Sequence, residues 1–129
     1  MTQTAEVEAG SVILAPGTSR RPLNVPGEKE FAGRGVSYCA TCDGFFYNNL
    51  KVGVLGNKDY AISEAIELLR FTKDLTIYTN GKQLEMSSKY EDEAKQFRVE
   101  TRQISKLDGS EFLERIFFAD GTSEQIDGV

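Results

Sequence analysis

The hydrophobic residues of this chain fall into short runs, and the spacing within each run predicts a different kind of element. Residues 12–15 are an apolar run that ends at a Pro-Gly pair, which predicts a buried strand followed by a turn. A polar stretch with several prolines and glycines continues to about residue 36. Loops of that length in compact domains are usually connectors or functional segments, so we expect this stretch to be one or the other.

The middle of the chain carries the clearest periodicity. Residues 51–55 predict a strand, and the apolar residues from 59 to 71 recur at helical spacing, with Asp59 placed to cap the helix. Residues 75–78 predict a second strand. Strand, helix and strand in this order predict a βαβ unit with parallel strands and a right-handed crossover.

The last third predicts a surface helix followed by hairpins. Ser88 and Glu91 have the spacing of a capping box, which would open a helix to about Phe97. Further strands are expected at residues 99–101, 103–107, 113–118 and 123–126, with Asp-Gly turn signals between the last three. The pattern predicts an α/β fold: a three-layer, Rossmann-like dinucleotide-binding domain in which a parallel sheet carries an antiparallel β-meander.

Composition narrows the class of protein. With 129 residues the chain is expected to be a single domain with enough surface to bury a core. Fifteen Lys and Arg against 20 Asp and Glu argue against nucleic acid or an anionic membrane surface as a partner, because both require clustered positive charge. The chain has no apolar run near the roughly 20 residues that span a bilayer and no signal-peptide pattern, so we expect a cytoplasmic protein.

The strongest chemical signal is the cysteine pair Cys39 and Cys42, the only two cysteines in the chain. Two intervening residues leave both sulfurs within bonding reach, so that one can resolve a mixed disulfide formed by the other. A lowered thiol pKa would keep one sulfur as the thiolate. Asp43, next to the second cysteine, can hold or deliver a proton. This pattern predicts a dithiol redox centre.

Two other interpretations of the cysteine pair stay open at the level of sequence. With two Cys and no His, the chain could supply half of a structural zinc site, which a partner would have to complete. The pair could instead form a purely structural disulfide, although so small a loop would restrict the unfolded chain little. Phe45 and Phe46, which follow the motif, are expected to be core residues.

A candidate dinucleotide site lies at the turn between residues 51–55 and the following helix. Its candidate contacts are Gly56, Asn57, Lys58, Asp59, Tyr60, Ala61 and, after the next strand, Thr79. The usual G-x-G-x-x-G/A pattern needs its second glycine so that the backbone can approach a pyrophosphate at the helix N-terminus, and here that position is Lys58. The second strand ends with neither an acid for NAD nor an arginine pair for NADP. We therefore expect a turn that keeps the shape of the site and has lost its ligand.

Residues 33–47, GRGVSYCATCDGFFY, resemble the redox motif of low-molecular-weight thioredoxin reductases. The resemblance extends over residues 12–129 in the length and order of the elements. It implies that residues 1–129 are the central, pyridine-nucleotide-type domain of such a reductase, with the flanking segments that bind FAD lying outside this chain. In the family the first cysteine exchanges with thioredoxin, the second faces the flavin and the adjacent Asp serves as the acid, which implies these roles for Cys39, Cys42 and Asp43.

The chain departs from the family at the nucleotide positions. The family's His-Arg-Arg-x-x-x-Arg signature after the second strand is absent, and Glu85 stands where its last Arg would bind phosphate. In this respect the chain is similar to thioredoxin-reductase-like flavoproteins that lack NADPH signatures, some of which take electrons from ferredoxin and others from a deazaflavin. The resemblance therefore implies a reductase that does not use NADPH.

The complete function implied is a homodimeric flavoprotein that passes electrons from FAD through the CxxC dithiol to thioredoxin or a thioredoxin-like protein. The isolated domain is expected to be inactive alone in the sense that it shows no catalytic turnover, since it carries no flavin beside the dithiol to reduce it again. Two alternatives remain: a module that senses redox state or docks thioredoxin without turnover, and a conventional NADPH-dependent thioredoxin reductase.

Overall fold

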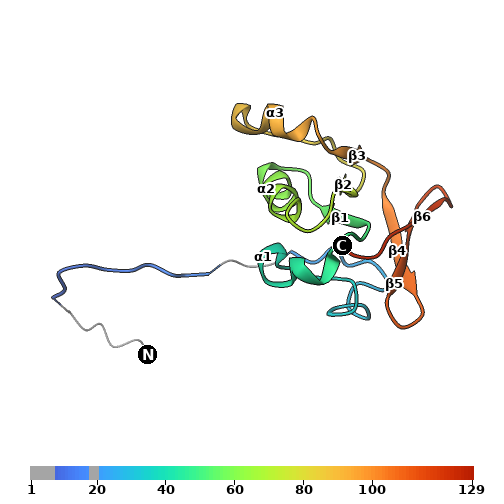
Figure 1. Cartoon of the computed structure of the whole chain (residues 1–129), viewed down its shortest axis with the longest axis horizontal. Helices are drawn as coiled ribbons and strands as arrows, with labels where there is room; N and C mark the ends of the chain where they lie inside the picture. The colour runs from blue at the N-terminus through green and yellow to red at the C-terminus, as the bar shows by residue number, and fades with distance from the viewer. Residues whose placement is uncertain (1–7, 18–20) are drawn as a thin grey trace.

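The computed structural model describes residues 8–17 and 21–129 (Figure 1). Two adjacent strands of its parallel sheet are joined through a helix, which confirms the predicted βαβ unit. The elements of this unit are β1 (Val52–Leu55), α2 (Asp59–Leu68) and β2 (Leu75–Tyr78), and the sheet is completed by β3 (Arg98–Glu100) in the order β1-β2-β3. All neighbouring strands in it run parallel.

One face of the parallel sheet is covered by α2. The helix buries four side chains, Ala61, Ile62, Ala65 and Leu68, against apolar residues of β1 and β2. Alternate residues of β2 point to the two faces of the sheet, as strand geometry requires, so Ile77 joins this core while Tyr78 lies in another. Gly53 in β1 makes room for Tyr78, because a Cβ atom there would lie 2.6 Å from the Tyr78 ring.

The other face is covered by an antiparallel meander. Its strands are β4 (Ile104–Gly109), β5 (Leu113–Phe118) and β6 (Ser123–Gln125). Buried side chains of β4 and β5 pack with Tyr78 and Ile126 to form the second core. The parallel sheet thus lies between a helix and a second sheet, and the predicted three-layer α/β class is confirmed.

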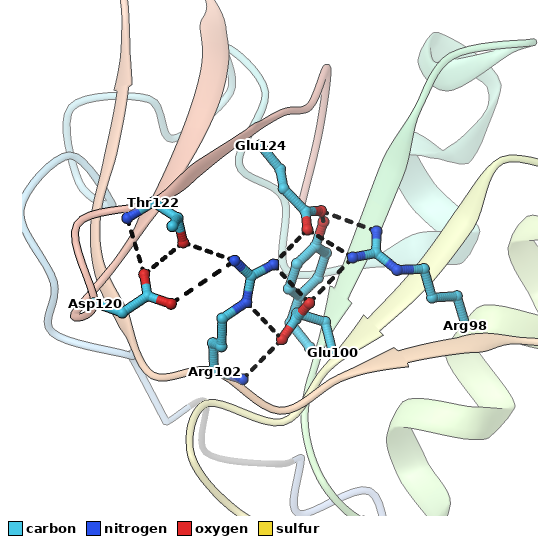
Figure 2. Close-up of polar contacts among 7 residues, drawn as sticks. Arg98, Glu100, Arg102, Asp120, Thr122 and Glu124 are labelled. Atoms are coloured by element: carbon cyan, nitrogen blue, oxygen red, sulfur yellow. Dashed lines mark hydrogen bonds and ion pairs between the residues drawn. The ribbon is translucent and has the colours of Figure 1, made fainter.

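A cluster of ion pairs connects β3 to the meander (Figure 2). Arg102 donates to Glu100 at 2.7 Å and to Glu124 at 2.6 Å, and Arg98 also reaches Glu124 at 2.6 Å. The buried Tyr78 hydroxyl donates to the Glu124 carboxylate at 3.1 Å. The hydrogen bonds from Arg102 hold the pKa of Glu100 at about 2, well below its ordinary value of 4.5. Burial, with the nearby Glu124 charge, raises the pKa of Tyr78.

The prediction of a buried strand at residues 12–15 is wrong. Val12, Ile13 and Leu14 are 74%, 92% and 86% exposed, and residues 8–17 form an extended segment that lies apart from the rest (Figure 1). An apolar run becomes a buried strand only where something covers it. Within the described ranges, none of the paired strands lies along this run.

Two predicted helices are shorter than their sequence patterns suggest. The first ends at Leu68 instead of residue 71, and the cap position is Lys58, whose side chain makes no capping hydrogen bond, instead of Asp59. The second is reduced to a 3-10 turn, η2 (Ser88–Tyr90), and one helical turn, α3 (Glu91–Ala94). The capping box is absent there, because the chain enters this helix through η2 and no side chain caps it.

The cysteine motif forms two short helical turns, α1 (Ala40–Asp43) and η1 (Gly44–Tyr47). They lie beside α2, below the parallel sheet in the view of Figure 1. None of the helices in the described ranges has both the length and the apolar character needed to traverse a bilayer.

Candidate redox site and dinucleotide turn

Cys39 and Cys42 form a disulfide, with their Cα atoms 5.3 Å apart. Cys39 is the N-cap residue of α1, and its sulfur accepts a hydrogen bond from the backbone amide of Cys42 at 3.2 Å. Cys42 is exposed and Cys39 is half-buried. The disulfide thus lies at the start of a helical turn, where backbone amides can also stabilise a thiolate, and one of its sulfur-bearing residues faces solvent.

Asp43 is held in place by a serine on the other side of the cysteines. The Ser37 hydroxyl donates to the Asp43 carboxylate at 2.5 Å and accepts from the backbone amide of Cys39 at 3.2 Å. One hydroxyl therefore links the proposed acid to the backbone of the first cysteine. Burial and the charge of Asp43 raise the pKa of the neighbouring Tyr47.

Two glutamates that the sequence analysis did not identify also hold the motif. Glu28, only 4% exposed, accepts hydrogen bonds from the Leu23 and Asn24 amides and from the Tyr38 hydroxyl, the last at 3.0 Å. Glu64 of α2 accepts from the Ala40 amide at 3.2 Å. The contact of Glu64 joins elements 24 residues apart, whereas Glu28 bonds to residues within the same loop, 4 to 10 residues away. Neither contact belongs to a recognised sequence motif.

The expectation that Phe45 and Phe46 are core residues is wrong. They are 58% and 67% exposed, and their ring centroids are 4.0 Å apart. Gly44 takes the buried position in this turn, where a Cβ atom would lie 2.6 Å from the ring of Phe71. As a result, the turn presents a pair of aromatic rings to solvent immediately after the disulfide.

The dinucleotide turn keeps the close approach of strand and helix that such sites use. A Cβ atom on Gly56 would lie 2.8 Å from the Cβ atom of Ala61, so only glycine fits there. Tyr60 is 72% exposed. Thr79 is buried, and its hydroxyl donates to the Lys82 carbonyl at 2.6 Å, which leaves it facing the interior.

Residues 83–87, which we call the strap, lie against this turn. The Glu85 amide donates to the Asn57 carbonyl at 2.9 Å, and the Ser87 amide donates to the Asp59 carboxylate at 2.8 Å. The hydrogen bond from Ser87 lowers the pKa of Asp59. The Lys58 ammonium lies 3.9 Å from the Glu85 carboxylate, with both side chains exposed.

The residues of this turn do not fit the phosphates of a dinucleotide. The position that needs a bare backbone carries the Lys58 side chain, whose charge is paired with Glu85. The Asp59 carboxylate adds negative charge at the start of α2, where a phosphate would need positive potential.

Comparisons with known proteins identify relatives of this chain. The family model described as pyridine nucleotide-disulphide oxidoreductase matches residues 2–129. A thioredoxin reductase of Treponema pallidum is 51% identical over 76 residues, which are 59% of this chain and 25% of that protein.

Solved structures agree with these matches. The atypical thioredoxin reductase TRi from Desulfovibrio vulgaris Hildenborough superposes with a TM-score of 0.80 at 35% identity, covering 87% of this chain and 38% of that one. A ferredoxin-flavin thioredoxin reductase from Clostridium acetobutylicum superposes with a TM-score of 0.68 at 25% identity, covering 85% of this chain and 36% of that one. This chain therefore spans well under half of each relative.

Proposed function

The chain belongs to the pyridine nucleotide-disulphide oxidoreductase family, on its low-molecular-weight thioredoxin reductase branch, and from this premise we propose that it is the disulfide-bearing domain of a flavin-dependent reductase that does not use NADPH. One combination of features supports the proposal. An accessible disulfide with an adjacent carboxylic acid occurs in the same domain as a dinucleotide turn that carries a lysine in place of the second glycine, with two carboxylates beside it.

In the proposed reaction, the dithiol form of Cys39 and Cys42 reduces a disulfide of a partner protein. The Cys39 thiolate attacks one partner sulfur, and the other partner sulfur leaves as a thiolate. The Cys42 thiolate then attacks the Cys39 sulfur, which restores the disulfide and releases the second partner thiolate. Two electrons pass to the partner, and the two protons lost by the thiols end on its sulfurs. Asp43, adjacent to Cys42, would carry one of these protons.

The partner we propose is thioredoxin or a thioredoxin-like protein. Phe45 and Phe46 support this proposal, because two exposed, adjacent aromatic rings next to a disulfide are typical of the centre of a protein–protein contact. A small-molecule disulfide would not require such a surface.

The electrons that reduce the Cys39–Cys42 disulfide would come from FAD, bound by polypeptide outside this chain in a homodimer. A reduced flavin supplies two electrons, the number that a disulfide takes up. For the donor to that flavin we propose ferredoxin or a deazaflavin in place of NADPH. The similarity to a protein named ferredoxin-flavin thioredoxin reductase supports the first of these.

A trapping experiment tests the disulfide exchange. Cys42→Ser leaves Cys39 without a resolving thiol, so the reduced variant should form a stable mixed disulfide with oxidised thioredoxin, visible by mass spectrometry. Cys39→Ser is the matched control and should trap much less, because its remaining thiol is the resolving one. Failure of both variants to form the adduct, with both folded, would exclude the proposed exchange.

A further inference from the structure

A second carboxylate reaches the redox turn from a different element. Glu64, half-buried on α2, accepts a hydrogen bond from the backbone amide of Ala40 at 3.2 Å. Ala40 is the first residue of α1 and directly follows Cys39. The negative charge is therefore bound to the same short turn whose amides would stabilise a thiolate.

The charge of Glu64 has no ion-pair partner among the described residues. Titratable groups that contact the turn within the described ranges include Asp43 on α1, Tyr47 on η1, and Tyr38 with its acceptor Glu28 from the preceding loop. None of these is a cation. A thiolate formed on reduction would therefore meet the negative charge of Glu64, which is bound one residue from Cys39.

We propose that Glu64 is a positioning residue that lowers the reduction potential of the Cys39–Cys42 pair and so makes the dithiol a stronger reductant. The benefit of a stronger reductant to the protein rests on the proposed function, whereas the effect on the potential does not. Its physical basis is that the disulfide carries no charge and is insensitive to Glu64, whereas the thiolate form is repelled by it. The effect exists only where a thiol ionises, so it must depend on pH.

The test is the equilibrium of the complete chain with small thiol–disulfide buffers, measured from pH 5 to pH 9. Glu64→Gln keeps the size of the side chain and an oxygen that accepts from Ala40, and removes the charge. Near pH 9 we expect the equilibrium constant for reduction to rise about threefold, which corresponds to a potential about 14 mV less negative. At any pH below the alkylation midpoints of both thiols, where neither is ionised, the two proteins should agree. The midpoint of cysteine alkylation against pH should move lower in the variant.

Two further variants isolate the charge. Glu67 lies on the same helix and pairs with Arg70. The control substitution Glu67→Gln should leave the potential unchanged. Glu64→Asp keeps the charge and should stay closer to the wild-type potential than Glu64→Gln. A shift of equal size at all pH values, or an equal shift in Glu67→Gln, would overturn the inference, as would the absence of any shift. Because the buffers contain no thioredoxin, these results are independent of whether thioredoxin is the partner.

Discussion

Ser37 is the residue on which the arrangement of the redox turn depends most directly. Its single hydroxyl donates a hydrogen bond to the Asp43 carboxylate and accepts one from the Cys39 amide. Removing it leaves a half-buried carboxylate without that donor and a backbone amide without its acceptor, and such losses cost more than the hydrogen bonds themselves contribute.

We therefore expect Ser37→Ala to lower the free energy of unfolding of the oxidised chain by about 1–2 kcal/mol in urea titrations. Ser37→Thr, which retains the hydroxyl, should recover most of this loss. Equal stability of wild type and Ser37→Ala would show that the two hydrogen bonds contribute nothing to the turn.

At the residue scale, the sequence predicted the disulfide of the site better than the residues that hold it in place. The cysteine spacing indicated the disulfide, because pairing of residues three apart is a local property. Glu64 was not identified, since its contact depends on how α2 packs against α1. Glu28 was not identified, since its contacts depend on the path of an irregular loop. Phe45 and Phe46 were misassigned because hydrophobicity alone does not distinguish a core residue from an exposed apolar one.

At the scale of elements, the strap and the start of α2 form one unit. Backbone amides of the strap are bound by Asn57 and Asp59, and Lys58 faces Glu85. The first consequence is that the wild-type chain should show no saturable binding of NADPH at micromolar concentrations in calorimetric titrations. Micromolar binding would contradict the account of this turn.

The same unit can be opened by substitution. Lys58→Gly combined with Glu85→Arg restores the bare backbone and replaces an acid with a phosphate-binding cation. We expect NADPH affinity to rise at least about tenfold over wild type, which is the gain expected from one charge-assisted hydrogen bond. NADH lacks the 2′-phosphate and should gain less, which makes it the matched control. Equal gains for both nucleotides would show that the introduced guanidinium does not contact the phosphate.

The strands and α2 were predictable because their apolar residues recur at regular spacing and pack against one another within the βαβ unit. The Ser88–Glu91 capping box failed because a spacing of suitable residues does not fix the backbone that must bring them together. The strap could not be predicted either, because it has no periodicity and its contacts are mainly through backbone groups.

At the scale of the whole molecule, the ion-pair cluster in Figure 2 joins the parallel sheet to the meander. Arg102 contacts Glu100 and Glu124 and also lies over the ring of Phe118, with 4.0 Å between its guanidinium carbon and the ring centroid. We expect Arg102→Met to lower the free energy of unfolding at pH 7, because it removes the shared cation of Glu100 and Glu124 and the contact with the Phe118 ring. Arg115→Met, which removes a bond to Ser123 only, should have little effect.

The cluster also predicts how stability depends on pH. The pKa of Glu100 is about 2 in the fold against an ordinary 4.5, so its contribution is complete above about pH 4.5 and is lost as the pH falls through about 2. Urea midpoints should therefore decrease from pH 5 to pH 3, and the decrease should be smaller in Arg102→Met. An identical acid profile in both proteins would show that Glu100 does not depend on Arg102.

The layered architecture followed from the order of the predicted elements, because βαβ units and antiparallel hairpins have few ways to share a core. The buried strand at residues 12–15 was the exception, since its burial would require a partner beyond the described residues. The homodimer, the flavin and the electron donor likewise involve other polypeptide or cofactors and stay predictions.

The most direct test is a single turnover of this chain. The 129-residue protein is reduced, freed of reductant and mixed anaerobically with oxidised thioredoxin, and thiols on each protein are counted over time. We expect about one thioredoxin disulfide to be reduced for each Cys39–Cys42 disulfide that re-forms, with no change on adding NADPH. If the chain keeps its dithiol in the presence of oxidised thioredoxin yet is oxidised by small disulfides, the proposed passage of electrons to a thioredoxin-like partner is wrong.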